Sequence, residues 1–78
     1  MSNYVVDEEL DASGLNCPLP LLKAKQALNR MQPGAVLRVL ATDAGSIRDF
    51  QSYTQQSDHE LLEMFTEDEP FTYIIKRG

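Results

Sequence analysis

Apolar residues recur at helical spacing in the stretch from residue 18 to residue 32. They stand three or four positions apart and form one stripe, made of Leu21, Ala24, Leu28 and Met31. Basic and polar side chains occupy the opposite face, so the pattern predicts an amphipathic helix packed on a core. Pro33 and Gly34 follow directly, and this pair predicts that the helix ends there.

Four segments have strand character. Residues 35–41 are almost continuously apolar and are interrupted only by Arg38, which is typical of a buried central strand. Residues 60–66 and 71–76 are separated by the acidic turn Glu67–Pro70 and predict a hairpin. Residues 4–12 predict a first strand, which Gly14 ends.

The segment Thr42–Ser46 contains capping residues and predicts the start of a second helix, which ends near Ser57. Its apolar stripe is narrow and consists of Ile47, Phe50, Tyr53 and Thr54. The resulting order is β-α-β-α-β-β. It predicts one α+β domain over residues 1–78, a two-layer α/β sandwich with a mixed four-stranded sheet and both helices on one face. The open face of the sheet would carry either Val36, Arg38 and Leu40 or the alternating set.

Composition narrows the class of function. A net charge of −5 argues against direct binding of nucleic acid, because domains that neutralise phosphates are normally basic. No apolar run approaches the ~18 residues of a membrane helix, and residues 1–11 lack the basic flank and apolar run of a signal peptide. A single cysteine allows no internal disulfide. These features predict a cytoplasmic protein that neither enters nor binds a membrane.

The single cysteine, Cys17, stands directly before Pro18-Leu19-Pro20. Proline is tolerated in the first turn of a helix and is costly further in, so both prolines predict a helix start. Cys17 is then expected to be the cap, with the Leu19 N–H donating to its sulfur. At this position the helix dipole favours the thiolate.

Basic residues surround Cys17 along the chain. No acid occurs between Asp11 and Asp43, and the intervening stretch contains four cations: Lys23, Lys25, Arg30 and Arg38. Positive surroundings lower a cysteine pKa from its ordinary value of about 8.5, so the sequence predicts a reactive thiolate. Lys23, Lys25 and Arg30 are candidate docking residues for acidic surfaces of partner proteins.

Other chemistry-bearing residues give weaker signals. His59 has no motif around it, and one histidine with one cysteine cannot supply the three or four ligands of a zinc site. We therefore expect neither a metal nor a cofactor. Asp43 and Asp49 are expected to cap and flank the second helix, and Asp43 is a further candidate for partner contact.

The stretch Ser13–Pro20 resembles the Gly-Leu-x-Cys-Pro-x-Pro signature of the TusA/SirA family, small bacterial proteins that carry sulfur as a cysteine persulfide. The chain length, the order of elements, the helix stop Met31–Gly34 and the segment Thr42–Asp49 also resemble that family. The resemblance implies that Cys17 is the catalytic residue. It also implies a supporting role for the other motif residues, which are Gly14, Leu15, Pro18 and Pro20.

The family resemblance implies a sulfurtransferase that works as a carrier. Cys17 would accept sulfane sulfur from a persulfide donor, typically a cysteine desulfurase, and pass it to a cysteine of an acceptor protein. In the best-known branch the relay ends in 2-thiouridine in tRNA, and that branch tends to have an acidic residue where this chain has Leu19. Selenium or thiosulfate-derived sulfur is an alternative cargo that the sequence leaves open.

Two classes of function therefore stand side by side. The first is a sulfur carrier, which benefits from the lack of a second cysteine because no resolving thiol of the same chain can expel the carried sulfur. The second is a non-catalytic regulatory or protein-interaction module that binds a partner through the open sheet face or the hairpin. Because a carrier must present Cys17 to two partners in turn, we expect a monomer.

Overall fold

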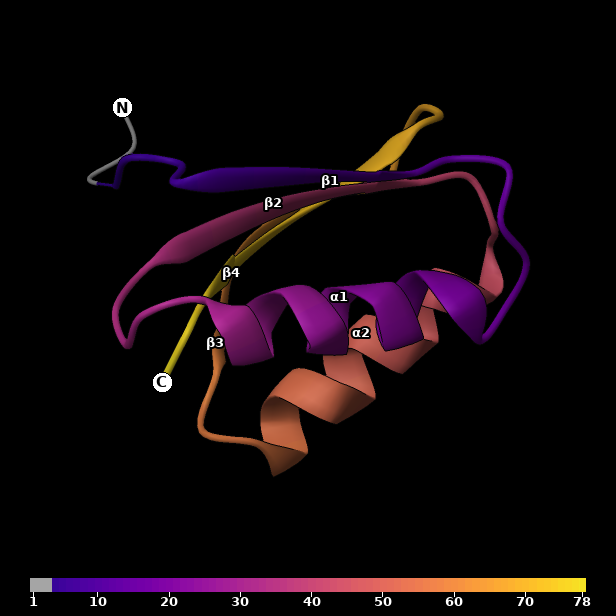
Figure 1. Cartoon of the computed structure of the whole chain (residues 1–78). Coiled ribbons are helices and arrows are strands. Elements are labelled where there is room, and N and C mark those ends of the chain that lie inside the picture. The colour runs from indigo at the N-terminus through magenta and orange to yellow at the C-terminus, as the bar shows by residue number, and fades with distance from the viewer. Residues whose placement is uncertain (1–3) are drawn as a thin grey trace.

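A computed structural model describes residues 4–78 and has the predicted order of elements (Figure 1). The bounds are β1 (Glu8–Ala12), α1 (Leu19–Arg30), β2 (Val36–Ala41), α2 (Gly45–Gln56), β3 (Glu60–Phe65) and β4 (Phe71–Lys76). The four strands form one sheet in the order β1-β2-β4-β3. β1 and β2 are parallel, whereas β4 is antiparallel to both β2 and β3. The mixed sheet and the α+β sandwich predicted from the sequence are therefore confirmed.

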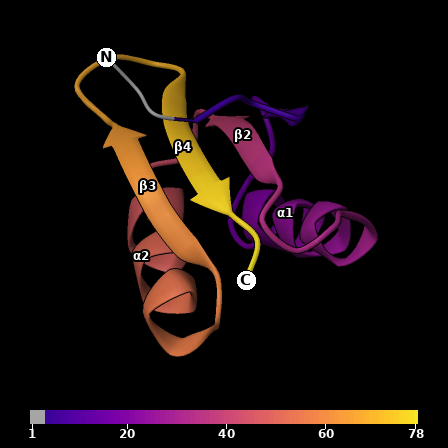
Figure 2. The same ribbon diagram turned by 90° about the vertical axis from the view of Figure 1, so that its left-hand side faces the viewer.

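Both helices cover the same face of the sheet. α1 packs against β1 and β2, and α2 packs against β3, so the helices lie side by side beneath the strands (Figure 2). The core between the layers is built from alternate residues of β2 and β4 and from one stripe of each helix. Its largest fully buried side chains include Tyr73, Phe50, Leu28, Leu37 and Ile75.

A stacked aromatic pair joins α2 to the sheet. The rings of Phe50 and Tyr73 lie 4.3 Å apart and within 15° of parallel. The Tyr73 hydroxyl is 2.7 Å from the Ser46 hydroxyl, which itself donates a hydrogen bond to the Asp43 carbonyl. This chain of contacts fixes the first turn of α2 against β4.

The first strand is shorter than the sequence predicts. It begins at Glu8 instead of residue 4, because Asp7 forms hydrogen bonds with both the N–H and the carbonyl of Val36. The Asp7 N–H donates to the Val36 carbonyl, and the Asp7 carboxylate accepts from the Val36 N–H at 2.8 Å. Tyr4, further back, donates its hydroxyl hydrogen to Glu63 of β3. Residues 4–7 therefore cross toward β3 and do not extend β1.

This crossing segment changes the open face of the sheet. Since Leu37, Val39 and Ala41 lie in the core, Val36, Arg38 and Leu40 are on the open side. Val36 is nevertheless buried, and it lines a hollow together with Tyr4, Val5 and other residues. The apolar face that the sequence leaves to solvent is thus covered in part by residues 4–7.

Both helices also differ slightly from prediction at their ends. α1 stops at Arg30, two residues early, since Met31 is extended and donates its N–H to the Leu28 carbonyl. α2 has no side-chain cap: its first turn follows Ala44, and the Asp43 carboxylate makes no capping bond. The Ser46 N–H and hydroxyl donate to the Asp43 carbonyl oxygen instead. The capping role predicted for Asp43 is therefore wrong.

Candidate functional site

Cys17 lies in the loop between β1 and α1, at the end of the sheet where β2 passes into α2. Gly14 begins this loop with φ +82°, a conformation that glycine adopts without strain. Its N–H donates to Thr42 Oγ1 at 2.9 Å, which ties the loop to the segment after β2. The Leu15 N–H donates to the Ala12 carbonyl and closes the turn. These bonds bring the loop that contains Cys17 next to the start of α2.

The helix start is shifted by one residue from the sequence prediction. Pro18, not Cys17, is the cap of α1, and Pro20 lies buried in the first turn. The Leu19 N–H, expected to donate to the sulfur, instead donates to the Asn16 carbonyl at 2.8 Å. Because this turn uses the nearest N–H group, Cys17 stands just outside the helix and is exposed.

The partner of the sulfur is a carboxylate. The Cys17 thiol donates a hydrogen bond to Asp49 Oδ2, with 2.8 Å between sulfur and oxygen. This bond is the largest of the effects that raise the pKa of the Cys17 thiol, followed by partial desolvation and by the negative charges of Asp49 and Asp43. The sequence prediction of a lowered pKa is therefore wrong, since the acids that follow residue 42 in the chain fold back onto the thiol.

The basic residues of α1 do not gather at the sulfur. Lys25 places its ammonium group 4.9 Å from the centre of the Tyr53 ring, between the two helices. Arg30 pairs with Glu8 at 3.8 Å, at the far end of a 12-residue helix that is about 18 Å long. Lys23 is exposed. Leu19 and Leu22, near the start of α1, are large apolar side chains that are about half exposed.

Gly45 is a site residue that the sequence analysis did not single out. A Cβ atom placed on Gly45 would lie 2.9 Å from Asp43 Oδ2, 3.4 Å from Cys17 Cβ and 3.6 Å from Cys17 Sγ. The Asp43 oxygen is itself buried and has no hydrogen-bond partner among residues 4–78. A glycine as the first residue of a helix, where alanine is a better helix former, was the available signal. The missing side chain lets the loop and its sulfur approach α2 closely.

Comparison with known proteins identifies the family of the chain. The family model described as "Sulfurtransferase TusA" matches residues 8–77. The chain belongs to the TusA family. It is 54% identical over 72 residues to a protein named sulfur carrier protein TusA from Allochromatium vinosum, covering 92% of this chain and 95% of the relative. A sulfur-transfer role follows from this membership.

The TusA-type fold is also shared with a solved structure. The crystal structure of a SirA-like protein from Desulfitobacterium hafniense is similar, with a TM-score of 0.72 at 26% sequence identity. The similarity covers 88% of this chain and 93% of the other. The likeness therefore includes most of the sandwich in both proteins.

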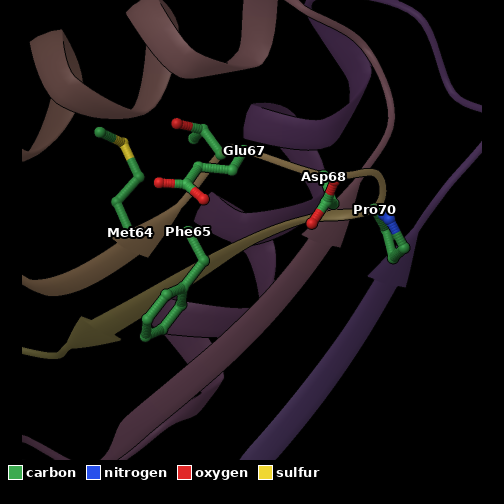
Figure 3. Close-up of a pocket in the computed structure, with 6 residues that line it drawn as sticks. Met64, Phe65, Glu67, Asp68 and Pro70 are labelled. Atoms are coloured by element: carbon green, nitrogen blue, oxygen red, sulfur yellow. The ribbon is translucent and has the colours of Figure 1, made fainter.

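Other features of the TusA-type chain lie away from the sulfur. A hollow of about 400 Å³ at the β3–β4 hairpin is lined by Met64, Phe65 and the turn residues, but not by Cys17. Figure 3 shows the Phe65 ring pointing away from Glu67 and Asp68. No helix within residues 4–78 is long and apolar enough to span a membrane. Within the same residues, no three His, Cys, Asp or Glu side chains are placed to hold a metal ion.

Proposed function

We propose that this protein accepts a sulfane sulfur as a persulfide on Cys17 and passes it to a cysteine of an acceptor protein. The observation that carries the proposal is the position of Cys17, which is exposed beside the start of α1 within the family motif. It is also the only cysteine in the chain. A thiol so placed meets the reactive groups of two partners in turn, as a monomeric carrier in the cytoplasm requires.

The proposed chemistry needs no cofactor. The Cys17 thiolate attacks the outer sulfur of the donor's persulfide, a new bond forms to Sγ, and the donor cysteine leaves as a thiolate. In the second step a thiolate of the acceptor attacks the outer sulfur now bound to Cys17, and Cys17 leaves as a thiolate. Each step forms one sulfur–sulfur bond and breaks one, so no oxidant or reductant is consumed.

The surface around Cys17 is suited to contact with proteins. Leu19 and Leu22 expose apolar surface near the start of α1, which follows Cys17, and Lys23 and Lys25 lie on the same helix. We propose that these four residues contact the donor, a cysteine desulfurase or another persulfide protein, and then the acceptor. Arg30 stands at the other end of α1, so its proposed docking contact would require a partner that follows the whole helix.

The first experiment is a mass measurement. The reduced protein is incubated with a cysteine desulfurase and cysteine, and its intact mass is taken without reductant, beside the matched variant Cys17→Ser. We expect the native chain to gain the mass of one sulfur atom and the variant to gain none. If several donors load no sulfur onto a thiol that alkylating agents reach, the interaction-module function takes the place of the carrier.

The destination of the sulfur is a second part of the proposal. We propose that it reaches tRNA as 2-thiouridine through acceptor proteins, without direct contact between this acidic chain and RNA. Cells in which Cys17→Ser replaces the native chain should then contain tRNA with less 2-thiouridine. Unchanged 2-thiouridine alongside a measured persulfide on Cys17 would assign the carrier to another product.

A further inference from the structure

Asp49 is placed to control the reactivity of Cys17. It follows Gly45 by four residues in α2, so the two residues share one face of the helix. Gly45 admits the sulfur to that face, and Asp49 accepts the hydrogen bond of the thiol at 2.8 Å. The thiol is exposed, and yet its hydrogen is directed at a carboxylate and not at water.

The contact with Asp49 favours the protonated form of Cys17. The thiol donates its hydrogen to the carboxylate, and this bond stabilises the thiol and not the thiolate. The negative charges of Asp49 and Asp43 raise the pKa of the thiol further, as a thiolate would stand against both carboxylates.

The raised pKa therefore favours the protonated and less reactive form of the cysteine in the free carrier. Persulfide exchange requires the thiolate, and the fraction of thiolate falls as the pKa rises. A partner that loads Cys17 must remove this restraint. The local charge indicates how. Asp43 and Asp49 both act on the thiol, and within residues 4–78 no positive charge is among the effects that shift its pKa.

We propose that Asp49 restrains Cys17 in the free carrier and that a cationic side chain beside the partner's reactive cysteine releases it by pairing with Asp49. This inference rests on the proposed carrier function, and it adds a requirement on the partner. An arginine or lysine that pairs with the carboxylate draws it from the thiol, the thiol proton passes to water, and the thiolate attacks. Asp49 thus makes Cys17 selective for proteins with a basic rim at the site of sulfur exchange.

Small reagents test the restraint without any sulfur donor. Methanethiosulfonates react with thiolates by forming a disulfide and releasing a sulfinate, and they exist with cationic, neutral and anionic tails. A unit charge about 6 Å from another in water alters an encounter rate by about threefold, so the rate for the cationic reagent should exceed that for the anionic one by about tenfold. A rise in salt concentration should reduce this preference in the native protein.

The variant Asp49→Asn removes the charge and keeps the shape. We expect it to react several-fold faster with the neutral reagent, with its reactivity rising at lower pH, and to lose most of the preference for the cation. Asp58→Asn makes the same chemical change beyond the far end of α2 and should behave as the native protein. Asp49→Glu, which keeps the charge, should retain the preference. Among the described residues, Asp43 is the other titratable group that acts on the thiol. Burial raises the pKa of the Tyr73 hydroxyl, and the charges of Asp43 and Asp49 also raise it.

The outcomes separate this inference from the carrier function. Equal cation preference in the native protein and in Asp49→Asn, or slower reaction of that variant with the neutral reagent, overturns the restraint. If Asp49→Asn does not fold, the salt dependence of the native protein decides: a preference that salt leaves unchanged overturns the restraint. Failure of Cys17 to load sulfur, with the charge effects present, would count against the carrier function and leave the restraint standing.

Discussion

Replacement of Gly45 by alanine tests how closely the sulfur approaches α2. The new methyl group would stand 2.9 Å from Asp43 Oδ2, nearer than Cβ atoms are found to other atoms. The Cys17 Cβ and Sγ would lie 3.4 and 3.6 Å away, close to ordinary contact. The Asp43 carboxylate must therefore move by a few tenths of an ångström, whereas Cys17 can stay where it is.

The energies of this change nearly cancel. Alanine in place of glycine stabilises a helix by up to about 1 kcal/mol. Moving the Asp43 side chain off its preferred rotamer costs about 0.5–1.5 kcal/mol. The free energy of unfolding should then stay within about 1 kcal/mol of the native value. Reactivity should change more, because the methyl group fills the space beside Sγ and restricts the approach of a reagent.

The assays are urea unfolding for stability and the alkylation rate of Cys17 for access. We expect Gly45→Ala to fold and to react several-fold more slowly than the native protein. Ser52→Ala, on the exposed side of α2, gives the effect of helix propensity alone and should leave the alkylation rate unchanged. An alkylation rate equal to the native one would show that Cys17 does not lie close to Gly45. A loss of unfolding free energy above about 3 kcal/mol would show that the Asp43 side chain cannot move aside for the new methyl group.

Three further changes test the core and the thiol. Tyr73→Phe removes the hydroxyl that bonds Ser46 but keeps the stack, and urea unfolding should show a loss of about 1 kcal/mol; no loss would mean that this buried bond contributes nothing. Phe50→Ala opens a cavity at a fully buried position and should cost about 3–5 kcal/mol in the same assay, and a loss below about 1 kcal/mol would contradict its place in the core. The raised pKa of Cys17 adds stability that is complete below the thiol's unfolded pKa and is lost as pH rises through the folded pKa. Between neutral and alkaline pH, Cys17→Ser should therefore lose less stability than the native protein, and equal losses would contradict the shift.

The layers of the fold could be predicted from the sequence because buried residues recur at the spacing of a helix or a strand. Residues 36–41 are apolar on both faces apart from Arg38, and the structure places this strand between β1 and β4. The residue at which β1 begins could not be predicted. Tyr4, Val5 and Val6 have strand character, but the bonds between Asp7 and Val36 end the pairing there. A side chain that substitutes for a backbone partner leaves no periodic signal.

The position of the reactive residue was likewise easier to predict than its surroundings. Cys17 stands out because a lone cysteine precedes two prolines. The charge around it was misjudged, since the residue that binds its hydrogen comes 32 positions later. Lys23 and Lys25 are close to Cys17 in the sequence. In the fold, the hydrogen bond from the Gly14 N–H to Thr42 Oγ1 brings the segment with Asp43 and Asp49 beside the thiol. Electrostatic predictions from sequence therefore fail where a loop contact joins two distant segments.

A protonated thiol is consistent with the work of a carrier that travels between partners. The thiolate is the form that oxidants attack, so a cysteine held as a thiol is protected while the carrier is free. The lack of a second cysteine removes the other route of loss, the internal disulfide. Under the proposed restraint, control of reactivity then lies in the encounter with the partner, where a cation paired with Asp49 would convert Cys17 into a nucleophile.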